Sequence, residues 1–219
     1  MKSSALGVTA VVLSIIILPV AFWLLLSTGK HNFRQLEIFG HKEMGVNGDT
    51  TYFTVPPFML INQNGDTVTE RTFDGKIYVA NFFFASCPGV CPKMTDAIQP
   101  VQEEFKKSDD VLFLSHTVDP LHDSLPALKA FAEKHKADLS KWFFVTGNRD
   151  SIYYLAIHGY LVPASEDARA EGGYLHSQDL LLIDKQKRIR GIYDSMEPEE
   201  IKRLKEEIKV LLYEYKEKK

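Results

Sequence analysis

The sequence predicts an α/β domain, with a mixed central sheet flanked by helices, attached to one amino-terminal transmembrane helix. Two observations indicate the domain: apolar runs typical of buried strands alternate with helical patterns, and 45% hydrophobic with 25% charged residues is the composition of a folded domain. An uncharged stretch near the amino terminus indicates the transmembrane helix. The formal net charge of -3 argues against a nucleic-acid binder.

The uncharged stretch covers residues 5–27 and is long enough to cross a bilayer as a helix. A cleaved signal peptide would have a shorter apolar region ending in a small-x-small site, so we expect a retained anchor over residues 1–30. The flanking positive charges are Lys2 on one side, and Lys30, Arg34 and Lys42 on the other. This difference faintly favours a cytoplasmic domain. Because no Arg-rich, Ser-rich presequence is present, a bacterial membrane is favoured over an organellar one.

A tether is predicted over residues 31–51, which lack clear periodicity, and the folded domain over residues 52–219. The domain is expected to open with a hairpin, because an Asn-Gly pair at residues 64–65 lies between short extended runs. Residues 77–84 are a nearly unbroken apolar run, which predicts a central strand covered on both faces.

Strands and helices then alternate, which predicts a parallel sheet with crossover helices. The helix after the central strand is marked by an apolar stripe of Met94, Ile98, Val101 and Phe105. The next expected elements are a strand over 111–118, a helix over 125–134, a strand over 143–145 and a helix over 150–157. After a loop over 163–173, a second hairpin is expected over 180–193, and a final helix from Pro198. This order predicts a thioredoxin-like fold.

Both cysteines of the chain, Cys87 and Cys91, lie in the predicted turn between the central strand and its helix. Sites in open α/β sheets form at the carboxyl ends of the strands, where this turn must lie. Pro92 suits the first helical position, which would make Cys91 the helix cap. We therefore expect thiols that are presented at a rim, with the thiolate form of Cys91 favoured by the positive end of the helix.

Three interpretations of the cysteine pair are open. A structural disulfide or two buried side chains is the simplest, but the flanking prolines indicate a rim. Redox exchange is the second, although thiol–disulfide enzymes use Cys-x-x-Cys, and the third intervening residue loosens the geometry for exchange. Binding of a soft cation, Cu(I) or Zn(II), is the third. A structural zinc site would need four protein ligands, and the chain has no further cysteine.

Three motifs follow one another along the domain. They are Cys87-Pro-Gly-Val-Cys91-Pro92, then Thr117-Val118-Asp119-Pro120 with Asp123, then His176-Ser177 leading into residues 180–184. In this order they resemble the Sco/SenC family, copper-handling factors for the assembly of cytochrome c oxidase. The resemblance covers roughly residues 56–214.

The resemblance implies that Cys87, Cys91 and His176 hold one copper ion, Cu(I) or Cu(II). Two thiolates and an imidazole form a three-coordinate site that suits Cu(I), with room for a further ligand around Cu(II). Asp119 and Asp123 are expected on the same rim. Two readings of them stay open: they orient His176 or tune the charge from behind the ligands, or they are ordinary turn and cap residues.

Three other candidate ligands have simpler explanations. His122 is interpreted as a solvent-exposed loop histidine. His116 lies in a strand of the buried type and is expected in the core. Met94 begins the apolar stripe of its helix, so we expect it to pack there although its sulfur suits Cu(I).

The resemblance also implies that the domain is exported to the extracytoplasmic side of a bacterial inner membrane, held by a single-pass anchor. There it would deliver copper to the dinuclear site of the copper-bearing oxidase subunit, and an upstream copper donor is a second candidate partner. One alternative is a thiol–disulfide reductase that keeps the oxidase cysteines reduced. A thiol peroxidase is a more distant alternative, because its threonine-bearing cysteine motif and Arg are not apparent in the sequence.

Overall fold

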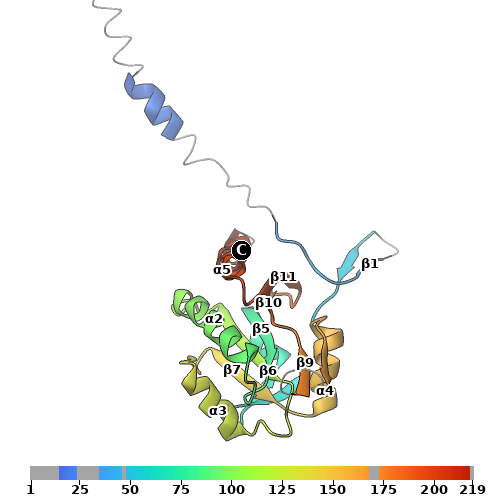
Figure 1. The fold of residues 1–219 in the computed structure, drawn as a ribbon. Coiled ribbons are helices and arrows are strands. Elements are labelled where there is room, and N and C mark those ends of the chain that lie inside the picture. Colours follow the sequence, from blue (N-terminus) through green and yellow to red (C-terminus); the bar gives the residue numbers. More distant parts are fainter. Residues whose placement is uncertain (1–14, 24–34, 46–47, 168–172, 218–219) are drawn as a thin grey trace, which may run out of the picture. The chain divides into compact units, whose positions relative to one another are not determined.

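The computed structural model describes residues 15–23, 35–45, 48–167 and 173–217, without the side chains of Leu175 and His176. The chain divides into two compact units, residues 1–34 and 35–219. In the first unit residues 15–23 are helical, drawn in blue in Figure 1. Within the described ranges, no helix is both long and apolar enough to span a membrane. The other residues of the predicted anchor, 1–14 and 24–30, lie outside the described part of the chain.

The second unit is built on a seven-stranded sheet with the strand order β11-β10-β5-β6-β7-β3-β4. Its three central strands run parallel: β5 (Ile77–Phe83), β6 (Val111–Thr117) and β7 (Trp142–Thr146). The outer strands, antiparallel to their neighbours, are β3 (Met59–Asn62), β4 (Thr67–Thr69), β10 (Asp179–Ile183) and β11 (Ile189–Asp194). The predicted mixed sheet, with a hairpin at each end of the domain, is confirmed.

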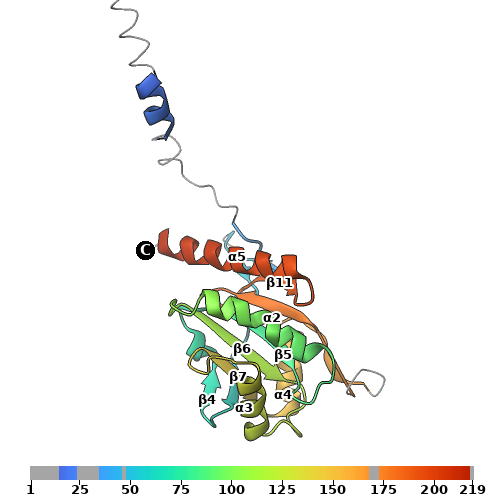
Figure 2. The same ribbon diagram turned by 60° about the vertical axis from the view of Figure 1, so that its left-hand side comes forward.

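Helices cover both faces of this sheet, which explains why every residue of β5 is buried. Figures 1 and 2 show three helices on one face, α2 (Val90–Glu104), α3 (Leu125–Lys134) and α5 (Pro198–Glu217). On the other face α4 (Arg149–Tyr154) runs directly into a π-helical turn (Leu155–Gly159). A short 3-10 helix (Glu70–Phe73) follows β4. The predicted apolar stripe of α2 is buried as expected, and α5 likewise buries one apolar face, formed by Ile201, Leu204, Ile208 and Leu211.

Two short hairpins lie outside the seven-stranded sheet. One pairs β1 (Lys42–Met44) with β2 (Thr50–Tyr52), within the segment predicted to be a tether. The other pairs β8 (Ala164–Glu166) with β9 (Tyr174–His176), so β8 lies where the sequence predicts a loop. Strands of three residues are too short to show a periodic pattern, which is why sequence reasoning missed all four.

A buried ion-pair network joins the segment before β1 to the rest of the domain. Asp184, directly after β10, accepts a hydrogen bond from Arg190 at 2.9 Å, and the same guanidinium contacts Glu214 of α5 at 3.2 Å. Arg190 also donates to the backbone carbonyls of Leu36 and Glu37, at 3.0 and 3.2 Å. These bonds hold residues 36–37 against the carboxyl-terminal part of the fold.

Candidate metal centre

The cysteine turn joins the end of β5 to the start of α2. Gly89 is the N-cap of α2, which makes Cys91 the second residue of the helix and Pro92 the third. The N–H of Cys87 donates to the Phe84 carbonyl at 3.2 Å, and the N–H of Cys91 donates to the Cys87 sulfur at 3.5 Å. The prediction that Cys91 caps the helix is therefore wrong. Pro92 is tolerated because N–H groups of a first helical turn have no helical partner.

Both cysteines are thiols, and both are buried, with Cys87 7% and Cys91 0% exposed. The expectation of exposed thiols is therefore wrong. Close to the turn, the ring of Tyr174 in β9 packs 5.2 Å from that of Phe84, the residue that follows β5. The pKa of Cys91 is raised far above its ordinary value, first by the hydrogen bond with Cys87 and then by burial. These effects outweigh the helix terminus, so the metal-free Cys91 is a thiol at neutral pH.

Asp123 fastens the loop after β6 to the cysteine turn. Its buried carboxylate accepts the N–H of Ala85 at 3.0 Å and also the hydroxyl of Thr117. Burial raises the pKa of Asp123, and these two hydrogen bonds partly offset that rise. The capping role belongs to Ser124, which accepts the N–H of Ala127 at the start of α3. Asp123 thus supports the turn two residues before Cys87.

Asp119 lies in the same loop after β6 as Asp123 and is also buried. Its carboxylate accepts hydrogen bonds from two side chains. The Nδ1 atom of His122 lies 2.8 and 3.0 Å from its two carboxylate oxygens, and the hydroxyl of Tyr174 is its second donor. The imidazole of His122 is 73% exposed, as expected for a loop histidine. Tyr174 was not identified from the sequence, where the only signal was its place two residues before His176.

His176 is the last residue of β9 and pairs with Ala164 of β8. Its side chain lies outside the described part, so its expected position near the cysteines stays a prediction. Among the described side chains, no group of three or more His, Cys, Asp and Glu residues could hold a metal ion. The two sulfur atoms at the start of α2 are soft donors, and they fit Cu(I) or Zn(II) better than a hard cation such as Mg²⁺.

Two alternative ligands are confirmed as core residues. Met94 is fully buried in α2. His116 is also buried, stacked on Phe82 with ring centroids 4.6 Å apart, and its Nδ1 lies 3.3 Å from the Asn81 carbonyl. Burial lowers the pKa of His116 to about 3, so this imidazole is neutral at physiological pH.

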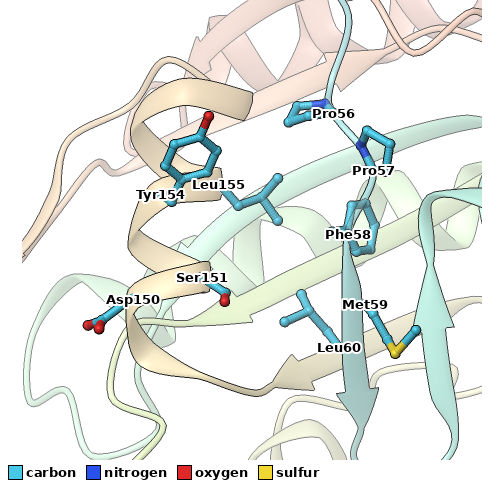
Figure 3. A pocket seen from close by; sticks show the side chains of 9 residues that line it. All are labelled: Pro56, Pro57, Phe58, Met59, Leu60, Asp150, Ser151, Tyr154 and Leu155. Carbon is cyan, nitrogen blue, oxygen red and sulfur yellow. The ribbon is translucent and has the colours of Figure 1, made fainter.

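Two cavities flank the sheet edge. One of about 350 Å³ adjoins the cysteine turn and is lined by Ala85, Ser86, His122 and Asp123, with side chains of α3. The other, of about 570 Å³, lies between α4 and the chain entering β3 (Figure 3). It is lined mainly by apolar groups such as Phe58, Leu60 and Leu155, and neither Cys nor His lines it. Of these two cavities, the smaller one adjoins the cysteine turn.

Fold and site together define a thioredoxin-like domain with two buried thiols at the start of the helix that follows the central strand. The chain belongs to the SCO1/SenC family, whose sequence model matches residues 47–212. The predicted resemblance is thereby confirmed.

Solved structures agree with this membership. A SCO1/SenC family lipoprotein from Bacillus anthracis strain Ames is 28% identical, with a TM-score of 0.68 over 73% of this chain and 95% of its own. BsSco, described as a member of the Sco family of cytochrome c oxidase assembly proteins with a disulfide switch, is 27% identical, with a TM-score of 0.59 over 66% and 85%. Copper-bound ScoI from Arabidopsis thaliana, 22% identical with a TM-score of 0.62 over 74% and 99%, shares the fold.

Proposed function

We propose that this protein binds one copper ion through Cys87, Cys91 and His176 and delivers it to the dinuclear copper site of cytochrome c oxidase during assembly. The observation that carries the proposal is the pair of thiols at the start of α2, with β9 packed against the adjoining end of β5 through Tyr174 and Phe84. Two thiolates and an imidazole suit copper. The likeness to BsSco, an oxidase assembly protein, supports the destination.

Delivery requires that the ion pass from these ligands to an incoming thiolate. Cys87 is slightly exposed whereas Cys91 is fully buried, so the incoming group meets the ion on the Cys87 side. The small cavity is lined by Ala85 and Ser86, the two residues before Cys87. Ligand exchange there needs no released ion. Oxidation of Cys87 and Cys91 to a disulfide would remove both sulfur ligands, so loading requires the reduced pair.

We expect copper binding to strengthen as pH rises, because the ion replaces the proton of Cys91. The pKa of Cys91 is raised, so the thiol is still protonated across the neutral range and its proton must leave on binding. The apparent association constant should rise about tenfold per pH unit for each proton released, between roughly pH 6 and 8. Competition titrations with a Cu(I) chelator of known proton dependence measure this slope. An affinity that does not change with pH would contradict the assignment of Cys91.

Copper transfer is the direct test of the proposed function. The full-length protein in detergent, reduced and loaded with Cu(I), is mixed with the copper-free, reduced copper domain of the oxidase subunit. We expect the metal to move to the recipient, measured as copper content after separation of the two proteins. His176→Ala should bind Cu(I) more weakly and lose part of its copper before mixing. If the wild-type protein keeps its copper in the presence of a recipient that is able to bind free Cu(I), the proposed delivery of copper is wrong.

The alternative function is a thiol–disulfide reductase that uses the same cysteines to keep the oxidase cysteines reduced. It is supported by the closeness of the two cysteines, since the N–H of Cys91 donates to the Cys87 sulfur at 3.5 Å. His176→Ala separates the two functions. It should retain full reductase activity toward an oxidised recipient but lose tight copper binding.

We further propose that residues 5–27 anchor the protein in a bacterial inner membrane with the domain on the extracytoplasmic side. The uncharged stretch supports the membrane anchor, and the proposed oxidase partner supports the extracytoplasmic side of the membrane. Protease added to intact spheroplasts should digest the domain. Protection of the domain until the membrane is opened would contradict this orientation.

A further inference from the structure

The strand that contains His176 is not part of the seven-stranded sheet. β9 pairs only with β8 in the described part of the chain, and these two strands form a sheet of their own. Backbone hydrogen bonds of the central sheet therefore do not fix β9 relative to the cysteine turn. Its position there depends on side-chain contacts as well as on the chain connection to β10, which begins at Asp179.

Tyr174, two residues before His176, makes contacts to both loops at the site. Its ring lies 5.2 Å from that of Phe84, whose carbonyl accepts the N–H of Cys87. Its hydroxyl is hydrogen-bonded to the buried carboxylate of Asp119, which follows β6. Burying a carboxylate without hydrogen-bond donors is energetically costly. The bond therefore stabilises the buried Asp119 and also holds β9 in place.

The chain is also held on the other side of His176. The carbonyl of Gln178 accepts hydrogen bonds from the hydroxyl and the N–H of Ser195, at 2.6 and 3.3 Å. His176 thus lies midway between two fastened residues, Tyr174 and Gln178. The Gln178 contact ties the chain to the end of β11, whereas the Tyr174 contacts tie it to the cysteine turn and to the loop after β6.

We propose that Tyr174 is a positioning residue of the copper site. Its hydroxyl bond to Asp119 and its ring contact with Phe84 hold β9 against the cysteine turn, which keeps His176 within bonding reach of an ion on Cys87 and Cys91. The inference rests on the proposed function, because it takes His176 as a ligand. It gives Asp119 a role through Tyr174 instead of through direct contact with the histidine.

Tyr174→Phe is the test, because it removes the hydroxyl and keeps the ring. Tyr153→Phe is the matched control, since that hydroxyl donates to the carbonyl of Val118, one residue before Asp119, at 2.8 Å. In full-length reduced protein we expect Tyr174→Phe to weaken Cu(I) binding about three- to tenfold, and Tyr153→Phe less than about twofold. The nitrogen hyperfine pattern of bound Cu(II) should change in Tyr174→Phe alone.

A double-variant comparison shows whether the effect passes through His176. In a His176→Ala background, Tyr174→Phe should cause no further loss of affinity, because the ligand that it positions is absent. Asp119→Ala should weaken binding like Tyr174→Phe, and the two losses should not add. Melting temperatures of all variants show whether each is folded.

The outcomes separate the inference from the function on which it rests. If wild-type protein does not bind copper, the proposed function fails. If wild-type protein binds copper and folded Tyr174→Phe binds it equally well, the positioning role is wrong while the function stands. A loss that persists in the His176→Ala background would also overturn it, because the tyrosine would then act on the cysteine turn directly.

Discussion

Cys87→Ala and Cys91→Ala should each abolish tight binding of Cu(I), and His176→Ala should weaken it at least about 100-fold. Replacing a group behind a metal ligand already costs about 10- to 100-fold in affinity, so removing a ligand itself should cost at least the upper figure. The cysteines should matter more, because thiolates are the soft ligands that Cu(I) prefers. Stoichiometry and affinity are measured by anaerobic titration of the reduced full-length protein against a competing chelator.

Substitutions at two residues that we do not assign as copper ligands serve as controls for this prediction. His122→Ala removes an exposed imidazole, and Met94→Leu replaces a buried thioether by a side chain of similar volume. Both should bind copper about as tightly as the wild type. Melting temperatures show whether the cysteine variants remain folded, since both thiols are buried. Unchanged tight binding in all three ligand variants would defeat the assignment.

The main elements of the fold were predictable because their patterns are long. Residues 77–84 form an apolar run that matches β5, and the apolar stripes of α2 and α5 repeat over several turns. The short hairpins left no such pattern. The hairpin of β8 and β9 matters most, because it carries His176 and covers the end of β5.

At the site, the sequence predicts where the cysteines lie but not their surroundings. A turn after a central strand must lie at the carboxyl edge of the sheet, so the place of Cys87 and Cys91 followed from topology. Around them, Phe84 packs against Tyr174, which is distant in the sequence, and the support of Ala85 depends on Asp123. Such contacts leave no local signal. The direction of the Cys91 pKa shift was predicted wrongly because the hydrogen bond with Cys87, and then the burial of the thiol, outweigh the effect of the helix start.

The Asp184 network lies at the edge of the sheet opposite to the cysteine turn. β10 runs antiparallel to β5, and Ile183 pairs with Tyr78 near the start of β5. Asp184, the next residue, is therefore beyond the beginning of β5, whereas Cys87 follows its end. The protein thus offers a stability variant that is remote from the proposed metal ligands.

We expect Asp184→Ala to lower the free energy of unfolding by about 3–5 kcal/mol, because it removes the partner of a buried guanidinium. Asp184 is 0% and Arg190 2% exposed, and Asp184 also accepts the backbone N–H groups of Gln186 and Arg188. Urea unfolding of the full-length protein measures the change. The control is Glu206→Ala, whose exposed pair with Lys209 should contribute less than about 1 kcal/mol.

Copper affinity gives this stability prediction a second readout. Below its unfolding transition, Asp184→Ala should bind Cu(I) as tightly as the wild type, because the change leaves the cysteine turn and the contacts of Tyr174 in place. A destabilisation no larger than that of Glu206→Ala would show that the network contributes little, since Arg190 keeps Glu214 and two backbone carbonyls as partners. A large loss of copper affinity in folded Asp184→Ala would instead mean that the two edges of the sheet are coupled through β5 and β10.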